Sequence, residues 1–171
     1  DLVVCDTDSR DCTTTEAALR VQQALAKFRR RRPTLIFKKV DSVLRGNVLA
    51  EIEAALSVLQ LPRCLLAPAN PSAGRTIRRG QYFIGRQPIH RTGFRFDPGH
   101  PRETSGVLTL LGTSRSRLTI SPPTRRALPE GITVGAAASR RDVQHWAGRV
   151  DQDVLAAGGA DFFTALLKQR G

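Results

Sequence analysis

The sequence predicts a three-layer α/β domain: a doubly wound, mostly parallel sheet covered by helices, with a hairpin-like excursion around residues 68–101. Two observations carry this prediction. Short apolar runs rich in β-branched residues alternate along the chain with stretches whose apolar residues recur at helical spacing. The chain also has 171 residues, of which 40% are hydrophobic, which is enough to fill one core. We therefore expect a single domain over residues 1–171.

The first half of the chain predicts strands and helices in alternation. The opening apolar run predicts a strand, and the capping-box sequence Thr13–Glu16 begins a helix that Pro33 ends. A second helix has its apolar residues on one face and stops at Pro62. The expected strands are residues 2–5, 34–37 and 64–67, and the expected helices carry apolar positions over residues 17–28 and 48–59.

The second half leaves this alternation and then returns to it. Residues 68–101 are rich in Gly, Pro and Arg and predict a hairpin around Tyr82–Gly85. The expected later strands are residues 118–120, 132–134 and 154–156, and the expected later helices carry apolar positions over residues 143–150 and 162–167.

The chain carries a formal net charge of +12, from 27 basic and 15 acidic residues. Such a field attracts acidic metabolites or nucleic acid. Arginine supplies most of the positive charge and lysine little of it, so codon bias in a GC-rich genome is an alternative origin of the charge.

Other features bear on location and on metal binding. No apolar run approaches the roughly 18 residues that span a bilayer, and the start lacks the basic region of a secretory signal. We therefore expect a cytoplasmic protein without a membrane partner. Three cysteines and three histidines lie scattered, without disulfide or metal-ligand spacing, and predict no metal site. The chain contains no Met and opens on an apolar run, so we expect it to be a fragment.

Dense polar clusters follow three of the predicted strands directly, at residues 6–10, 38–47 and 68–75. The carboxyl ends of parallel strands meet at one edge of a sheet, and open α/β sheets bind ligands there. We therefore expect one substrate-binding site at this edge, built from Asp8, Arg10, Lys39, Asp41, Ser42, Arg45, Gly74 and Arg75.

The residue types in these clusters predict the kind of ligand. Arg45 and Arg75 can each grip a carboxylate or phosphate through two parallel hydrogen bonds, so we expect them to clamp an anion. Acidic and hydroxyl side chains such as Asp41 can pair with ligand hydroxyls, and Gly46 and Gly74 allow close backbone approach. The pattern predicts a small hydroxylated anion. The alternative is structural ion pairing at the loop ends, with Arg45 bridging loops.

These clusters resemble the signature blocks of the four-carbon acid sugar kinase family. The blocks occur in the family's order, with similar spacing, over nearly the whole chain. Val43 stands where the family usually has Thr, and Asn70 where an aromatic residue is common. The matching blocks are DTDSR at residues 6–10, KKVDSVLRGN at 38–47 and PANPSAGRT at 68–76, with Gly80, Asp97-Pro98 and a glycine motif at residues 156–160.

The resemblance implies an N-terminal domain that binds a sugar acid such as threonate or erythronate, and a C-terminal domain that binds ATP. The family's opening strand and acidic motif do not precede Leu2, and no glycine-rich nucleotide site or P-loop pattern follows. We therefore expect a partial domain, truncated at both ends, with ATP and Mg bound in the full-length parent and neither on this chain. The substrate positions of the family fall on Arg10, Lys39, Asp41, Ser42, Arg45 and Arg75.

Without the nucleotide domain, we expect the chain to bind its ligand without turnover. The alternatives are a non-catalytic remnant of such a kinase and a basic nucleic-acid-binding module that uses the arginine runs at residues 29–32, 78–79 and 125–126. Only 5% of residues are aromatic and no stacking or zinc motif accompanies the charge, so we do not expect a nucleic-acid partner. The sequence leaves a homodimer open.

Overall fold

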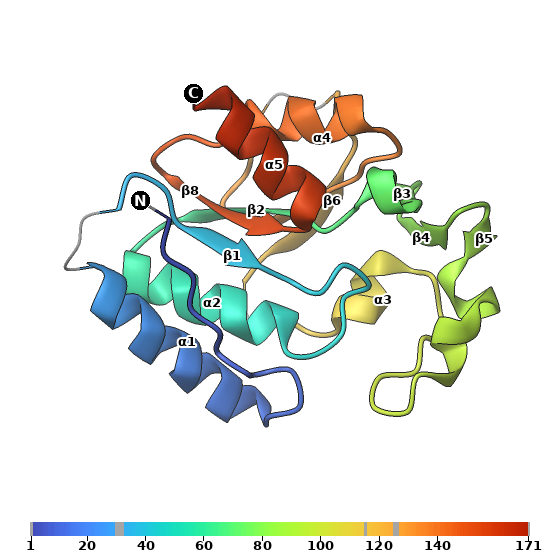
Figure 1. The fold of residues 1–171 in the computed structure, drawn as a ribbon, viewed down its shortest axis with the longest axis horizontal. Helices are drawn as coiled ribbons and strands as arrows, with labels where there is room; N and C mark the ends of the chain where they lie inside the picture. Colours follow the sequence, from blue (N-terminus) through green and yellow to red (C-terminus); the bar gives the residue numbers. More distant parts are fainter. Residues whose placement is uncertain (1, 30–32, 115, 125–126, 171) are drawn as a thin grey trace.

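The computed structural model describes residues 2–29, 33–114, 116–124 and 127–170. Its centre is a five-stranded sheet in the order β1-β8-β2-β7-β6 (Figure 1). Every neighbouring pair in it is parallel, so the carboxyl ends of the strands lie at one edge. The strands are β1 Phe37–Lys39, β2 Arg63–Ala67, β6 Leu118–Ser121, β7 Gly131–Gly135 and β8 Val154–Gly158.

Helices cover both faces of this sheet. On one face α1 packs on α2, and on the other α4 packs on α5 (Figure 1). Apolar residues of the helices and of the sheet form one core, in which Ile52 of α2, Leu65 of β2 and Phe162 of α5 are buried. The predicted three-layer, doubly wound α/β fold is confirmed. The helices are α1 Thr14–Arg29, α2 Val48–Leu59, α4 Arg140–Ala147 and α5 Ala160–Gln169.

The predicted excursion is a small antiparallel sheet in the order β3-β4-β5. It is attached to the main sheet at its carboxyl edge, where the Ile77 amide donates to the carbonyl of Ala137, two residues beyond β7. Its strands are β3 Arg75–Arg78, β4 Gln81–Ile84 and β5 Gln87–Pro88, and the short helices around them are the 3₁₀ turns Pro71–Ala73, Ile89–Arg91 and Gly93–Phe96 and the α-helix α3 Val107–Leu111.

The predicted strand at residues 2–5 is wrong, because these residues have no regular secondary structure. The side chains of Leu2 and Val4 are exposed, at 70% and 82% of their accessible surface. β-branched residues favour a strand where one face of the strand is buried, and the exposed side chains of residues 2–4 show that this segment has no buried face.

The predicted strand at residues 34–37 is displaced, since β1 begins at Phe37 and includes Lys38 and Lys39. Two lysines in succession resemble a loop in the sequence. An edge strand tolerates them, and here the Lys38 ammonium pairs at 2.6 Å with the buried carboxylate of Glu51 in α2.

Two further features of the described chain bear on function. None of its helices has the length and apolar character that crossing a bilayer requires. Within the described ranges, no three His, Cys, Asp or Glu side chains come together in a way that could hold a metal ion.

Candidate functional site

The loop from β1 to α2, residues 40–47, is wound around the carboxylate of Asp41. One oxygen of this carboxylate accepts hydrogen bonds from the backbone amides of Val43, at 3.0 Å, and Arg45, at 3.1 Å. The backbone adopts positive φ at Leu44 and again at Gly46, with φ of 64° and 80°. Asp41 therefore fixes the shape of the loop as well as carrying its charge.

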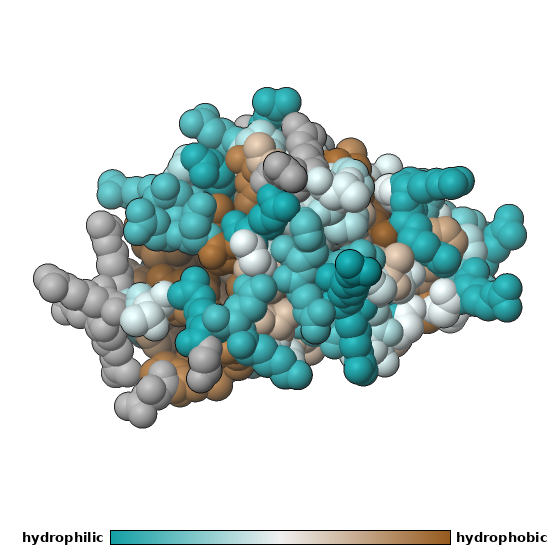
Figure 2. All heavy atoms as spheres, turned by 90° about the horizontal axis from the view of Figure 1, so that it is seen from above, coloured by the Kyte–Doolittle hydropathy of each residue, from teal (hydrophilic) through white to brown (hydrophobic). Residues whose placement is uncertain are grey.

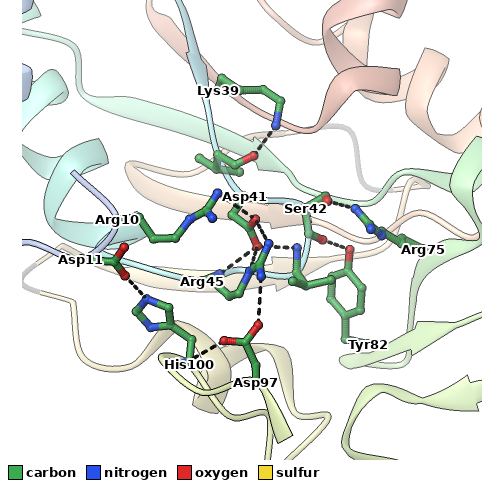
Figure 3. A network of polar contacts seen from close by, with 12 residues as sticks. Arg10, Asp11, Lys39, Asp41, Ser42, Arg45, Arg75, Tyr82, Asp97 and His100 are labelled. Carbon is green, nitrogen blue, oxygen red and sulfur yellow. Dashed lines mark hydrogen bonds and ion pairs between the residues drawn. The ribbon is translucent and has the colours of Figure 1, made fainter. Parts of the chain in front are cut away.

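Arg45 joins this loop to the excursion. Its Nε and Nη2 donate to the two oxygens of Asp41, at 3.2 and 2.9 Å, and its Nη1 donates to Asp97 at 2.9 Å (Figure 3). Burial raises the pKa of the Asp41 carboxyl, but hydrogen bonds from the side chain and backbone of Arg45 and from the Val43 amide outweigh burial and hold the pKa below its ordinary value. The structural alternative, in which Arg45 bridges loops, describes what this side chain contacts.

Asp97 links the excursion to the N-terminal loop through His100. The second oxygen of Asp97 accepts the backbone amide of His100 at 3.0 Å, and the His100 ring lies 3.1 Å from the carboxylate of Asp11 (Figure 3). The Arg45 hydrogen bond lowers the pKa of Asp97. Three segments that are distant in sequence therefore meet at this point.

Arg10 reaches the same carboxylate from the N-terminal loop, with its Nη2 at 3.5 Å from Asp41. Its backbone lies against Gly46, where a Cβ would come within 3.1 Å of the Arg10 Cα. Glycine is favoured there, because any other residue would combine a strained positive φ with this tight contact. More than half of the Arg10 side chain remains exposed, at 53%.

The excursion contacts the opposite side of the loop through Ser42. The Arg75 guanidinium donates to the Ser42 hydroxyl, and the hydroxyl of the buried Tyr82 donates to the Ser42 carbonyl (Figure 3). Arg75 also lies over the ring of Phe94, 5.9 Å from its centroid. The hairpin strands β3 and β4 thus hold Arg75 beside residues 40–47.

The charges of Asp41, Arg75 and Arg10 also act on Lys39. Its Nζ donates to the carbonyl of Val40 at 2.6 Å. Partial burial lowers the pKa of the ammonium, the charge of Asp41 raises it, and the charges of Lys38, Arg75 and Arg10 lower it again. Lys39 therefore belongs to the same electrostatic environment as the rest of the site.

Two predicted site residues are placed differently. The Asp8 side chain is 98% exposed and pairs with Arg20 of α1 at 3.9 Å, so its contact is with a helix, and its part in substrate binding stays a prediction. Arg20 also donates to the carbonyls of Thr7 and Asp8, which orients this stretch towards α1. Gly74 has φ of 68° and accepts the Gly85 amide at 2.7 Å, and is thus a turn residue of the excursion.

Arg102 is a residue of this site that the sequence did not predict. Arg102 is only 7% exposed, and the charges of Asp41, Asp97 and Arg45 all affect its pKa. The sequence carries no signal for it, because the excursion is rich in arginine throughout and only the fold shows which one is buried. We call the following group the Asp41 cluster: Arg10, Lys39, Asp41, Ser42, Arg45, Arg75, Asp97 and Arg102.

Cations outnumber carboxylates in the Asp41 cluster, so it suits an anion. Elsewhere, hydrophilic side chains spread over much of the face seen in Figure 2. Of the arginine runs considered for nucleic acid, residues 30–32 and 125–126 lie outside the described residues. Arg78 stacks on Phe83, with its guanidinium carbon 4.3 Å from the ring centroid.

The parallel sheet, with a cation-rich cluster at its carboxyl edge, defines the class of this protein as a doubly wound α/β domain. The chain belongs to the family of sugar-binding N-terminal domains, whose model matches residues 1–165. It is 35% identical to the D-threonate kinase of Salmonella typhimurium over 112 residues, which are 65% of this chain and 26% of that protein. It is 34% identical to the D-erythronate kinase of Heliobacterium modesticaldum over 102 residues, covering 59% of this chain and 23% of that protein. The chain thus corresponds to about a quarter of the length of these relatives.

Solved structures show the same fold. A domain of unknown function from Bordetella bronchiseptica, crystallised as a domain-swapped dimer with bound citrate, has a TM-score of 0.78 at 28% identity, over 93% of this chain and 43% of that one. A putative tRNA synthase from Salmonella typhimurium has a TM-score of 0.86 at 22% identity, over 95% of this chain and 44% of that one, and it bears on the fold alone.

Proposed function

We propose that the chain is the sugar-acid-binding part of an ATP-dependent kinase that phosphorylates a four-carbon acid of the threonate or erythronate type. The observation that carries the proposal is the cation-rich Asp41 cluster at the carboxyl edge of the sheet, where α/β domains bind small ligands. The names of the related kinases support this substrate class.

The cluster offers what a hydroxy acid needs. Arg10 is half exposed and close to Asp41, so its guanidinium can turn to an incoming carboxylate. The Ser42 hydroxyl accepts from Arg75, which leaves its own proton to donate to a ligand oxygen. Lys39 adds a further positive charge near these groups. Together they favour an anion that also carries hydroxyl groups.

The described residues do not fit a nucleotide site. No P-loop pattern occurs in the sequence, and the described ranges hold no group of three His, Cys, Asp or Glu side chains that could bind a metal ion. We propose that ATP and Mg bind to another part of the parent protein and that this chain alone binds its ligand without turnover; the kinase names of relatives of which it covers about a quarter support this.

Calorimetric titration tests the proposal. D-threonate and D-erythronate are titrated into the chain, with the neutral polyols threitol and erythritol as matched ligands that lack the carboxylate. We expect the acids to bind and the polyols to bind at least tenfold more weakly, and no ATP-dependent product from the chain alone. Equal binding of acid and polyol, or no binding of either acid, contradicts the proposal. Salt-sensitive binding of arbitrary duplex DNA in place of the acids would favour a nucleic-acid module.

The assembly is a second part of the proposal. The Bordetella bronchiseptica relative is described as a domain-swapped dimer, and this chain exposes Leu2, Val3 and Val4 in a segment without regular structure. We propose a homodimer. Light scattering coupled to gel filtration should give twice the 18.7 kDa mass of the chain, and a monomer mass across the accessible concentration range contradicts the dimer.

A further inference from the structure

Arg102 is a buried cation with incomplete pairing. Only 7% of the residue is exposed, and its Nε has no hydrogen-bond partner among the described residues. Its backbone amide donates to the carbonyl of Phe94 at 3.0 Å, which fixes the chain at this point. Arginine is rarely buried to this extent unless a carboxylate or another anion pairs with it, because desolvation of an unpaired charge is costly.

The two carboxylates whose charges act on Arg102, Asp41 and Asp97, already accept hydrogen bonds from other groups. Asp41 accepts donors from Arg45 and Val43 on its two oxygens, and Asp97 accepts Arg45 on one oxygen and the His100 amide on the other. Burial lowers the pKa of Arg102, while the charges of Asp41 and Asp97 raise it. Both carboxylates therefore attract Arg102 electrostatically, while the ion pairs that they form among the described residues are with Arg10 and Arg45.

Arg45 and Arg102 differ in what an anion would gain from them. All three guanidinium nitrogens of Arg45 donate to the protein's own carboxylates. An anion that took Arg45 would have to replace these bonds, whereas an anion that reached Arg102 would satisfy a buried donor that lacks a partner.

We propose that Arg102 is an anion-binding residue of the Asp41 cluster and takes the carboxylate of the hydroxy acid, whereas Arg45 is a positioning residue that holds residues 40–47 and Asp97 in place. This inference rests on the proposed function for the identity of the ligand. It changes the assignment expected from the sequence, in which Arg45 and Arg75 clamp the anion.

Binding to substituted chains tests the role of Arg102. Arg102→Gln and Arg102→Lys are titrated with D-threonate, and Arg86→Gln is the matched control, because it removes the same charge from an exposed position in the same excursion. We expect Arg102→Gln to weaken binding roughly ten- to a hundredfold. Arg102→Lys should recover little, since an ammonium does not reproduce the planar guanidinium, and Arg86→Gln should bind like the wild type.

Ligand-free stability separates anion binding from a structural role. The neutral Arg102→Met variant removes a buried charge whose Nε has no hydrogen-bond partner among the described residues, so its Tm should stay equal to that of the wild type or rise. If Arg102 instead stabilises the fold, Tm should fall by more than about 4 °C. Such a fall, with binding per folded molecule retained, overturns the proposal.

The outcomes distinguish the two proposals. Binding of D-threonate that Arg102→Gln leaves unchanged overturns the role of Arg102 and leaves the proposed function standing. Binding of citrate or inorganic phosphate, but of no four-carbon acid, with loss in Arg102→Gln, supports the anion site and overturns the proposed substrate class. A wild type that binds none of these anions overturns both.

Discussion

The loop at residues 40–47 and the N-terminal stretch at residues 6–10 both carry motif residues, but the fold treats them differently. In the loop, Asp41 is 11% exposed and its carboxylate organises backbone and side-chain donors. In the N-terminal stretch, the Asp8 side chain is 98% exposed and contacts a helix. The difference shows that a motif marks a site, while burial and pairing decide which of its residues determine the geometry of that site.

Asp41 and Asp8 give the sharpest test of this comparison. Asp41→Asn removes the charge that pairs with Arg45 and Arg10, and should lower the free energy of unfolding by about 2–3 kcal/mol. Asp8→Asn should change it by less than about 0.5 kcal/mol, because the side chain is exposed. Urea unfolding of both variants measures the two values. Equal effects would show that the two segments do not differ as we describe.

Gly46 tests the contact between the two segments. In Gly46→Ala the new Cβ would lie 3.1 Å from Arg10, and the residue would have to keep its positive φ. The substitution should lower the free energy of unfolding by about 2 kcal/mol and weaken ligand binding by displacing Arg10. Gly80→Ala is the control, because it shares the positive φ but meets nothing within 4 Å. It should cost about 1 kcal/mol. A cost for Gly46→Ala no greater than for Gly80→Ala contradicts the close contact.

The pH dependence of stability isolates the charge of Asp41. Its folded-state pKa lies below the unfolded value, so the carboxylate stabilises the fold above about pH 4, and this contribution is lost as the pH falls through the folded pKa. The difference in unfolding free energy between the wild type and Asp41→Asn should therefore shrink below about pH 4, by at most about 1.4 kcal/mol per pH unit. Unfolding curves at pH 7, 5 and 3 measure it, and a difference that grows towards low pH contradicts the pairing.

Tyr82 tests the attachment of the excursion to the loop. Tyr82→Phe removes the hydroxyl that donates to the Ser42 carbonyl and should cost about 1 kcal/mol. Because the same strands carry Arg75, anion binding should weaken along with stability. Unchanged stability with unchanged binding would mean that the hairpin does not position Ser42.

The sequence predicts those parts of the fold whose pattern and burial agree. β2, β7 and β8 are apolar runs that lie inside the sheet, and all three form close to their expected residues. The same kind of run at residues 2–5 forms no strand, because strand formation also needs a face to bury, which these exposed residues lack and which no local pattern reveals.

The sequence likewise predicts only those parts of the candidate site that do not depend on contacts between distant segments. Asp41, Ser42 and Arg75 come together as expected, because they follow parallel strands or lie on the hairpin beside them. The pairing of Arg45 with Asp97 joins residues that are 52 positions apart, and the burial of Arg102 depends on how the excursion folds back. Neither leaves a trace in the spacing of residues along the chain.

Amide hydrogen exchange with and without D-threonate tests the central claim, that a small hydroxy acid binds at the Asp41 cluster. We expect saturable slowing of exchange at residues 40–47 and 97–102, with no change in the exposed turn at Gly85 and Arg86. Unchanged exchange in the first two segments at saturating ligand, or slowing confined to another part of the chain, would contradict the account.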